Sequence, residues 1–192
     1  MKLISPLLFA AAAVLSVPAA APVTYDIDPS HTYPSFEADH MGGLSTWRGK
    51  FNQTSGVIVL DRAARSGTID ITVQIASIDF GHDEMNRHAV ASDIFDAARY
   101  PTATFKGRFT AFDGDRPTEA AGDFTLRGVT RTLKLDIDDF KCIQHPMEKR
   151  EACGADVSAS FNRGDYGLDF ALDMGFKPEV ELEIQVEALR RP

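Results

Sequence analysis

The feature that most constrains this chain is an alternation of apolar and polar residues with a period of two. In TIDITVQIAS (residues 68–77) polar residues alternate with four apolar ones, Ile69, Ile71, Val73 and Ile75. Successive side chains of a β-strand point to opposite faces, so this period predicts a strand with one apolar face and one solvated face. The apolar face must be buried against something, and the rest of the sequence indicates what.

The same alternation recurs along the chain with little helix between. Residues 83–92 are the main stretch that reads as helical, with a further turn at 96–99 before Pro101. With so little helix available, the strands must cover one another in a sandwich or a closed barrel. The expected strands are 35–41, 46–52, 57–60, 68–77, 102–112, 122–127, 131–137, 156–161 and 179–189.

Nearly every expected strand is apolar on one side only, which favours one antiparallel sheet rolled around a common interior. The fold class is therefore all-β, a single barrel of about eight strands with one short helix. Periodicity alone leaves open whether side chains fill that interior or whether it holds a small ligand. No linker or internal repeat divides the chain, so residues 21–192 are expected to form one domain.

The first 20 residues are predicted to be a secretory signal peptide. Lys2 is followed by an apolar run and then by the small residues of PAAA. The alternative is a retained membrane anchor, but the run is shorter than the roughly 20 residues that span a bilayer. The mature protein is therefore expected to be exported to the periplasm.

The charge of the chain argues against two classes of partner. The sequence has 20 Lys and Arg against 28 Asp and Glu, a formal net charge of −8. A surface this acidic does not attract nucleic acid, nor does it adhere electrostatically to anionic lipid.

Only two cysteines occur, Cys142 and Cys153, within CIQHPMEKREAC. In an oxidising compartment an even pair of cysteines predicts a disulfide, here a staple on a long loop. A metal site using both thiolates and His145 is the alternative, but it has no evident fourth ligand.

Three segments resemble the YceI-like, lipocalin-like proteins described as polyisoprenoid-binding. The segments are SHTYPSFEADHMGGLSTWRGKF, SDIFDAARYPTATFKG and GDFTLRGVTRTLKLDI, and the turn NRGDYG also fits. The matching positions are Phe36, His40, Gly42, Arg48, Gly49, Phe51, Phe95, Asp96, Tyr100, Pro101, Phe105, Gly122, Thr125, Gly128, Val129 and Thr130. The sequence departs from the family pattern at residues 86–89, and the cysteine pair is not general to the family.

The resemblance implies an eight-stranded antiparallel barrel with a hydrophobic channel for a polyisoprenoid lipid or an isoprenoid quinone. The expected function is a non-catalytic periplasmic carrier that needs no cofactor beyond this ligand. A membrane protein that loads the lipid and a homodimer are left open as partners. The residues expected to line the channel are Phe36, His40, Trp47, Phe51, Ile71, Val73, Phe105, Phe109, Phe124, Leu126, Leu135, Phe161 and Ile184.

His40 has two interpretations. His40 lies an even number of residues from Phe36, so both side chains are expected on the same, inner face of the strand. There the imidazole either contacts the polar head of a ligand or belongs to the core and bonds to the protein backbone. Arg163 and Asp165 are expected to fix the glycine-rich turn around them.

Two other functions stay open on the sequence. The stretch HDEMNRH, with His82, Asp83, Glu84 and His88, is the best candidate for a metal-dependent enzyme that acts on a lipid. Two histidines are few for a metal site, and a solvated helix with a Glu84–His88 pair explains them equally. The second alternative is a structural or interaction barrel that is packed solid and binds no ligand.

Overall fold

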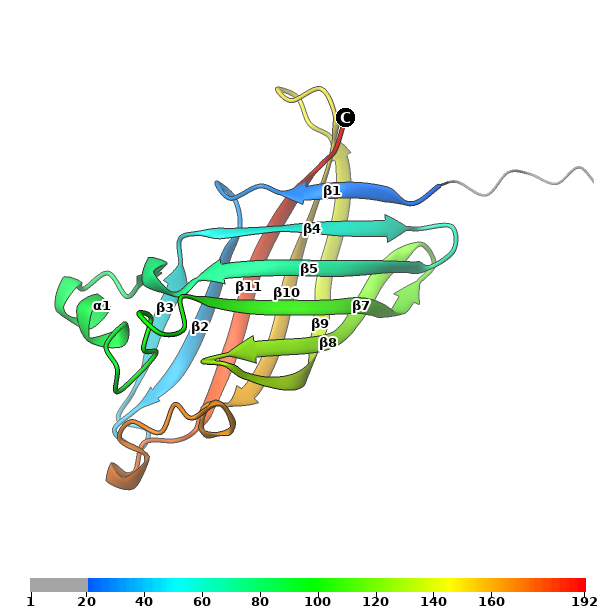
Figure 1. The fold of residues 1–192 in the computed structure, drawn as a ribbon. Helices are drawn as coiled ribbons and strands as arrows, with labels where there is room; N and C mark the ends of the chain where they lie inside the picture. Colours follow the sequence, from blue (N-terminus) through cyan, green and yellow to red (C-terminus); the bar gives the residue numbers. More distant parts are fainter. Residues whose placement is uncertain (1–20) are drawn as a thin grey trace, which may run out of the picture.

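A computed structural model describes residues 21–192; the predicted signal peptide, residues 1–20, lies outside the described residues. Eight antiparallel strands form a closed ring in the order β1-β4-β5-β7-β8-β9-β10-β11, and pairing of β11 with β1 closes it (Figure 1). These strands are β1 (Val23–Ile27), β4 (Thr54–Asp61), β5 (Ser66–Gln74), β7 (Thr102–Asp113), β8 (Arg116–Leu126), β9 (Val129–Gln144), β10 (Glu151–Asn162) and β11 (Glu179–Arg190). The predicted barrel is confirmed.

Strand β11 is shared between two partners, and this sharing shapes the barrel. Its last residues pair with β1, whereas its first half, Val180 to Gln185, pairs with β2 (Tyr33–His40). Strand β3 (Ser45–Phe51) extends the sheet beyond β2, and the short β6 (Ile78–Asp79) pairs with the end of β3. At one end the wall is therefore completed by β2 and β3 together with the segment that contains the helix.

That helix is α1, Asp83–Ala89, which ends three residues earlier than the sequence pattern predicts. His82 caps its N-terminus, because the imidazole Nδ1 accepts a hydrogen bond from the backbone N–H of Met85 at 3.2 Å. After α1, residues 91–99 form hydrogen-bonded turns that return to α1: Phe95 N–H donates to the carbonyl of Ala89. Tertiary hydrogen bonds thus replace the last predicted helical turn.

Two side chains depart from the predicted parity. Ile75 does not continue the apolar face of β5, because the strand ends at Gln74 and Ile75 begins the 3₁₀ turn η1 (Ile75–Ser77), where it is buried. In β7 the register with β8 shifts between Phe109 and Ala111. Strict alternation from Phe109, which is predicted to line the channel, would put Ala111 on the inner face as well. The bulge removes it from that face, and Phe112 packs against the core instead.

One end of the barrel carries a buried apolar cluster, whose residues also line the interior. Tyr25, Ile27, Leu60, Cys153 and Ala188 form a buried cluster there, on strands β1, β4, β10 and β11. Two further buried clusters include Tyr166 of the turn η2 (Arg163–Tyr166) and Ala89 of α1, and the turn η3 (Leu172–Met174) follows η2 in the chain. Within residues 21–192, no helix has the length and apolar character needed to cross a membrane.

Candidate functional site

The interior of the barrel is a cavity of about 340 Å³. Its wall is formed by the inward-facing side chains of the strands, as the alternation of residues predicts. All thirteen residues predicted to line a channel line this cavity, from Phe36 on β2 to Ile184 on β11. Whether any of them contacts a ligand stays a prediction.

The wall is overwhelmingly apolar. It includes aromatic rings from different strands, such as Phe36 beside Phe51, with ring centroids 5.7 Å apart, and Phe124 beside Phe161, at 5.5 Å. Gly49 leaves room for this packing, since a Cβ there would lie 2.6 Å from the ring of Phe36. A cavity with so few polar groups favours a hydrophobic ligand.

The sequence analysis missed the part of the lining that comes from outside the strands. Met85 and Ala89 of α1, Ile94 and Phe95 of the following turns, and Phe170 and Phe176 after η2 all face the cavity. Only Phe95 carried a signal, as one of the positions that match the family pattern. The others have no strand periodicity, so only the folded chain shows that they close the wall.

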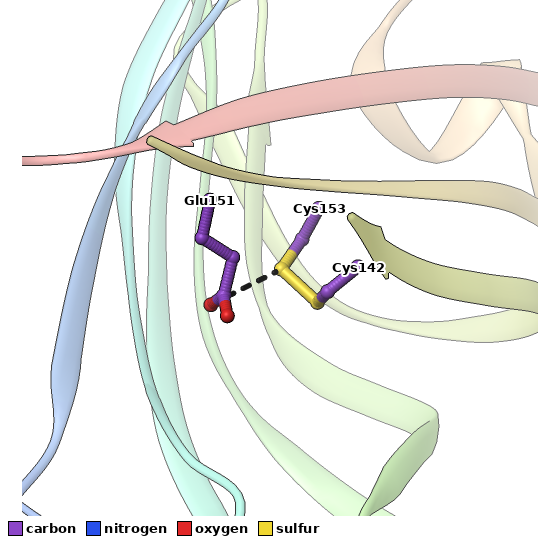
Figure 2. A group of neighbouring side chains, drawn as sticks. All are labelled: Cys142, Glu151 and Cys153. Atoms are coloured by element: carbon purple, nitrogen blue, oxygen red, sulfur yellow. Dashed lines mark hydrogen bonds between the residues drawn. A yellow bond between two sulfur atoms is a disulfide. The ribbon is translucent and has the colours of Figure 1, made fainter. Parts of the chain in front are cut away.

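A cross-strand disulfide lies at the end of the barrel that carries the cluster of Tyr25 and Leu60. Cys142 of β9 and Cys153 of β10 face each other in register, and their sulfurs are bonded. The predicted disulfide is confirmed, but it clamps a β-hairpin near its tip and does not staple a long loop (Figure 2).

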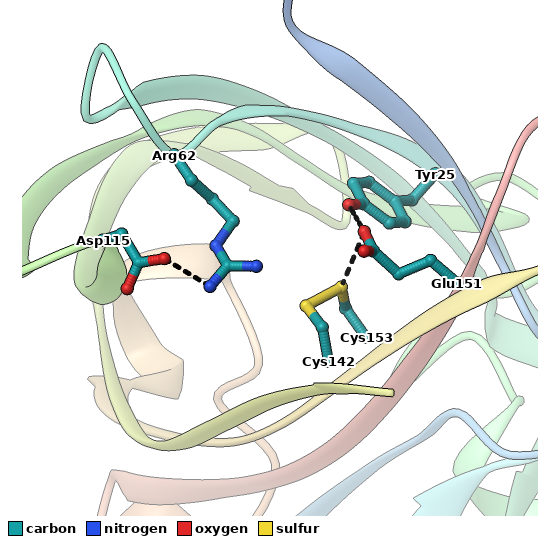
Figure 3. Close-up of a disulfide and its surroundings, with 6 residues drawn as sticks. All are labelled: Tyr25, Arg62, Asp115, Cys142, Glu151 and Cys153. Carbon is teal, nitrogen blue, oxygen red and sulfur yellow. Dashed lines mark hydrogen bonds and ion pairs between the residues drawn. A yellow bond between two sulfur atoms is a disulfide. The ribbon is translucent and has the colours of Figure 1, made fainter. Parts of the chain in front are cut away.

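A partly buried hydrogen bond lies beside the disulfide. The hydroxyl of Tyr25 donates to the carboxylate of Glu151, which joins β1 to β10 (Figure 3). Burial, and then the Glu151 carboxylate, raise the pKa of Tyr25 well above its usual value. Because β1 pairs with β11 over only three residues, this bond supports the seam that closes the ring.

The opposite end of the cavity, which we call the polar end, carries His40 and Arg163 of the lining. His40 of β2 lies between the rings of Trp47 and Phe176, with centroid distances of 5.2 and 5.4 Å. Its Nδ1 is 3.5 Å from the hydroxyl of Ser45, a long contact. Both His40 and Trp47 line the cavity, so the imidazole is a polar group in a mostly apolar wall.

Arg163 fixes the segment that borders this end. Its Nη1 donates to the carbonyl oxygens of Leu168, at 2.6 Å, and Phe170, at 2.9 Å. Burial lowers the pKa of Arg163 from its ordinary value, and the charges of Asp169 and Asp39 act in the opposite direction. The prediction that Arg163 orders the glycine-rich turn agrees with these contacts.

The HDEMNRH cluster does not assemble into a site. His82 caps α1, and the Nε2 of His88 lies 3.2 Å from the carboxylate of Asp93. The side-chain partner of His88 is therefore Asp93, whereas the spacing in the sequence had suggested Glu84. His88 also packs edge-on against Phe170, at 5.1 Å between ring centroids, and lines the cavity.

Two other groups of potential metal ligands occur among the described residues. Cys142, Glu151 and Cys153 form one (Figure 2), but their thiols are used in the disulfide. Asp28, His31 and Glu187 form the other, at the exposed corner between β1 and β2, where the carboxylate of Asp28 is already bonded to Ser30 and His31. Of these six residues only Cys153 lines the cavity, and its sulfur is bonded to Cys142.

Comparison with known proteins agrees with this architecture. The family model of the YceI-like domain matches residues 25–188. The chain belongs to the YceI-like family. A UPF0312 protein of Vibrio cholerae is 30% identical over 184 residues, covering 94% of this chain and 95% of the relative. Protein YceI of Escherichia coli O6:H1 is 28% identical over 185 residues, covering 94% of each.

Solved structures share the fold of this YceI-like chain at lower identity. BcnA of Burkholderia cenocepacia superposes with a TM-score of 0.68 at 20% identity, over 84% of this chain and 98% of that protein. A polyisoprenoid binding domain from Saccharophagus degradans, implicated in plant cell wall breakdown, gives a TM-score of 0.62 at 14% identity, over 88% and 99%. At these identities the likeness concerns the fold.

Proposed function

We propose that this protein binds an isoprenoid lipid or quinone inside the barrel and carries it through the periplasm. The observation that carries the proposal is the cavity of about 340 Å³ with an almost wholly apolar wall. That volume lies in the range of roughly 300–1,000 Å³ that small-molecule sites occupy. Membership of the YceI-like family, and the polyisoprenoid binding domain of the same fold, support this class of ligand.

The thermodynamics of the cavity suit loading and release. Each methylene that leaves water contributes about 0.8 kcal/mol, whether it enters the barrel or a bilayer. The barrel therefore needs only to approach the affinity of the membrane for the same chain. A ligand held by apolar contacts alone can be exchanged, whereas a polar contact at His40 would add preference for a particular head.

Export to the periplasm belongs to the same proposal. The disulfide Cys142–Cys153 is typical of proteins that fold in an oxidising compartment. The order of charge, apolar run and small residues in the first 20 residues indicates a cleaved signal peptide. N-terminal sequencing of protein from the periplasmic fraction tests whether the signal peptide is cleaved. A mature chain that still begins at Met1 would contradict the proposed export.

The direct test is organic extraction of the purified protein followed by mass spectrometry. We expect an isoprenoid lipid or quinone in near-stoichiometric amount. Replacing Val73, on the cavity wall, by Lys should abolish its recovery, whereas Thr72→Lys, which is absent from the cavity lining, should not. Extracts from well-folded wild-type protein that contain no lipid beyond the level of Val73→Lys would refute the proposal.

A further inference from the structure

Four exposed apolar side chains surround the polar end of the cavity: Met41, Leu44, Phe170 and Met174. They are 57%, 73%, 42% and 72% exposed, and they make up most of the large apolar side chains that stand in solvent among residues 21–192. We call these four residues the mouth rim. Exposed single apolar residues are ordinary, but a group of them beside a hydrophobic cavity calls for an explanation.

Two segments that are far apart in the sequence bring the mouth rim together. The turn between β2 and β3 lies against the loop after η3, and a Cβ on Gly42 would lie 3.1 Å from the carbonyl oxygen of Gly175. The carboxylate of Asp39 accepts hydrogen bonds from the backbone N–H groups of Gly42 and Lys177, each at 2.9 Å. Figure 1 shows both segments at the same end of the molecule, away from the β9–β10 hairpin.

The mouth rim is continuous with the cavity wall. Phe170 belongs to both, and Phe176 and His40 of the wall lie in the same two segments as the exposed residues. An apolar chain that leaves the cavity at this end would pass the imidazole of His40 and the ring of Phe170 and then meet the exposed side chains of the rim.

We infer that the mouth rim inserts into the surface of a phospholipid bilayer, so that lipid passes directly between membrane and barrel. This inference rests on the proposed function and names the partner of that same cavity. Four exposed apolar side chains are few beside the roughly 20–30 residues that each partner contributes to a standard protein interface, which argues against a second copy as the occupant. A few Met, Leu and Phe side chains suffice for reversible contact with a bilayer interface. Since the chain has a net charge of −8, apolar insertion, and not attraction to anionic lipid, provides this contact.

The test measures transfer from vesicles. Stripped protein is mixed with phosphatidylcholine vesicles that contain a long-chain ubiquinone, and quenching of Trp47 reports arrival in the cavity. The rim variant carries Leu44→Ser, Met174→Ser and Met41→Asn, the last because the backbone of Met41 has a φ of 53° that Asn tolerates. The matched control, Ile143→Ser with Met147→Ser, removes two exposed apolar residues from the β9–β10 segment at the other end.

For the wild type and the control variant we expect the rate of ubiquinone transfer to rise with vesicle concentration. For the rim variant, at the same vesicle concentration, we expect a rate about tenfold lower. Flotation of ligand-free protein with the same vesicles should fall in the rim variant alone. Equal rates in the rim variant and wild type, a rate independent of vesicle concentration, or a rate that grows with the content of anionic lipid would each overturn the inference. A concentration-dependent dimer that the rim variant abolishes would also overturn it.

A water-dispersed short-chain ubiquinone separates this inference from the proposed function. The rim variant should bind it with the wild-type affinity, because the cavity is unchanged. If the wild type does not bind it at all, the proposed function fails. If all proteins bind it and only the vesicle experiments show no difference, the membrane contact alone is wrong.

Discussion

The imidazole of His40 and the indole of Trp47 lie 5.2 Å apart, centroid to centroid, on neighbouring strands at the polar end of the cavity. Trp47 is paired with Ala38 and His40 with Ser45, so the two rings are diagonal neighbours on the inner face of β2 and β3. The single tryptophan of the chain is therefore a reporter placed beside the one imidazole that we expect to meet a ligand head.

The first prediction uses this pair. Short-chain ubiquinone should quench Trp47 saturably, because quinones quench indole emission at short range, and an alkyl amphiphile of equal length should compete without quenching. His40→Ala should weaken quinone binding by up to about tenfold, the value of one hydrogen bond, and leave the alkyl competitor unchanged. His31→Ala, at the exposed corner between β1 and β2, is the control. Equal losses for both ligands would assign His40 a structural role only.

The second prediction concerns the parity of β5. Val73→Lys should lower the free energy of unfolding by at least about 2 kcal/mol, because it places an unpaired charge in an apolar wall. Thr72→Lys, whose strand neighbours Ser55 and Thr104 are uncharged, should change it by less than about 1 kcal/mol. Urea unfolding measures both, and similar values would show that the assignment of faces is wrong.

The third prediction concerns the hairpin disulfide. The double variant Cys142→Ser, Cys153→Ser should lose about 2–3 kcal/mol of stability, because the disulfide restrains an 11-residue separation in the unfolded chain. Wild-type protein under reducing conditions should unfold at the same urea concentration as the double variant. A stability that reduction leaves unchanged would mean that the β9–β10 hydrogen bonds suffice without the crosslink.

The fourth prediction follows from the buried hydroxyl of Tyr25. Its pKa is raised in the folded protein, so its contribution to stability is complete below the unfolded value of about 10 and is lost as the pH rises from there toward the folded value. Tyr25→Phe should therefore show a smaller loss of stability between neutral pH and pH about 11 than the wild type. At neutral pH the variant should be less stable by about 1–3 kcal/mol, because the partly buried carboxylate of Glu151 loses its donor. Thermal unfolding across this pH series gives both quantities, and parallel curves for the two proteins would contradict the prediction.

Much of the barrel is determined by the sequence alone. Strict alternation in segments such as 68–74 and 179–189 assigns each side chain to a face, because successive side chains of a β-strand point to opposite faces of the sheet. The scarcity of helix then leaves the strands only one another to pack against, which determines an all-β fold. For this reason all thirteen residues chosen from parity and resemblance line the cavity.

Only the tertiary structure decided the features that depend on contacts between distant segments. The alternation of residues predicts which face of a strand points inward, but it does not give the distance between opposite walls of the barrel. The sequence therefore could not show that the interior is hollow. The splitting of β11 between β1 and β2, the cap that His82 forms on α1, and the partner of His88 depend on where loops meet in space. The mouth rim is the clearest case. Leu44 and Met174 are 130 positions apart by residue number and have no periodic pattern, and hydrogen bonds from both segments to Asp39 bring them to one end of the cavity.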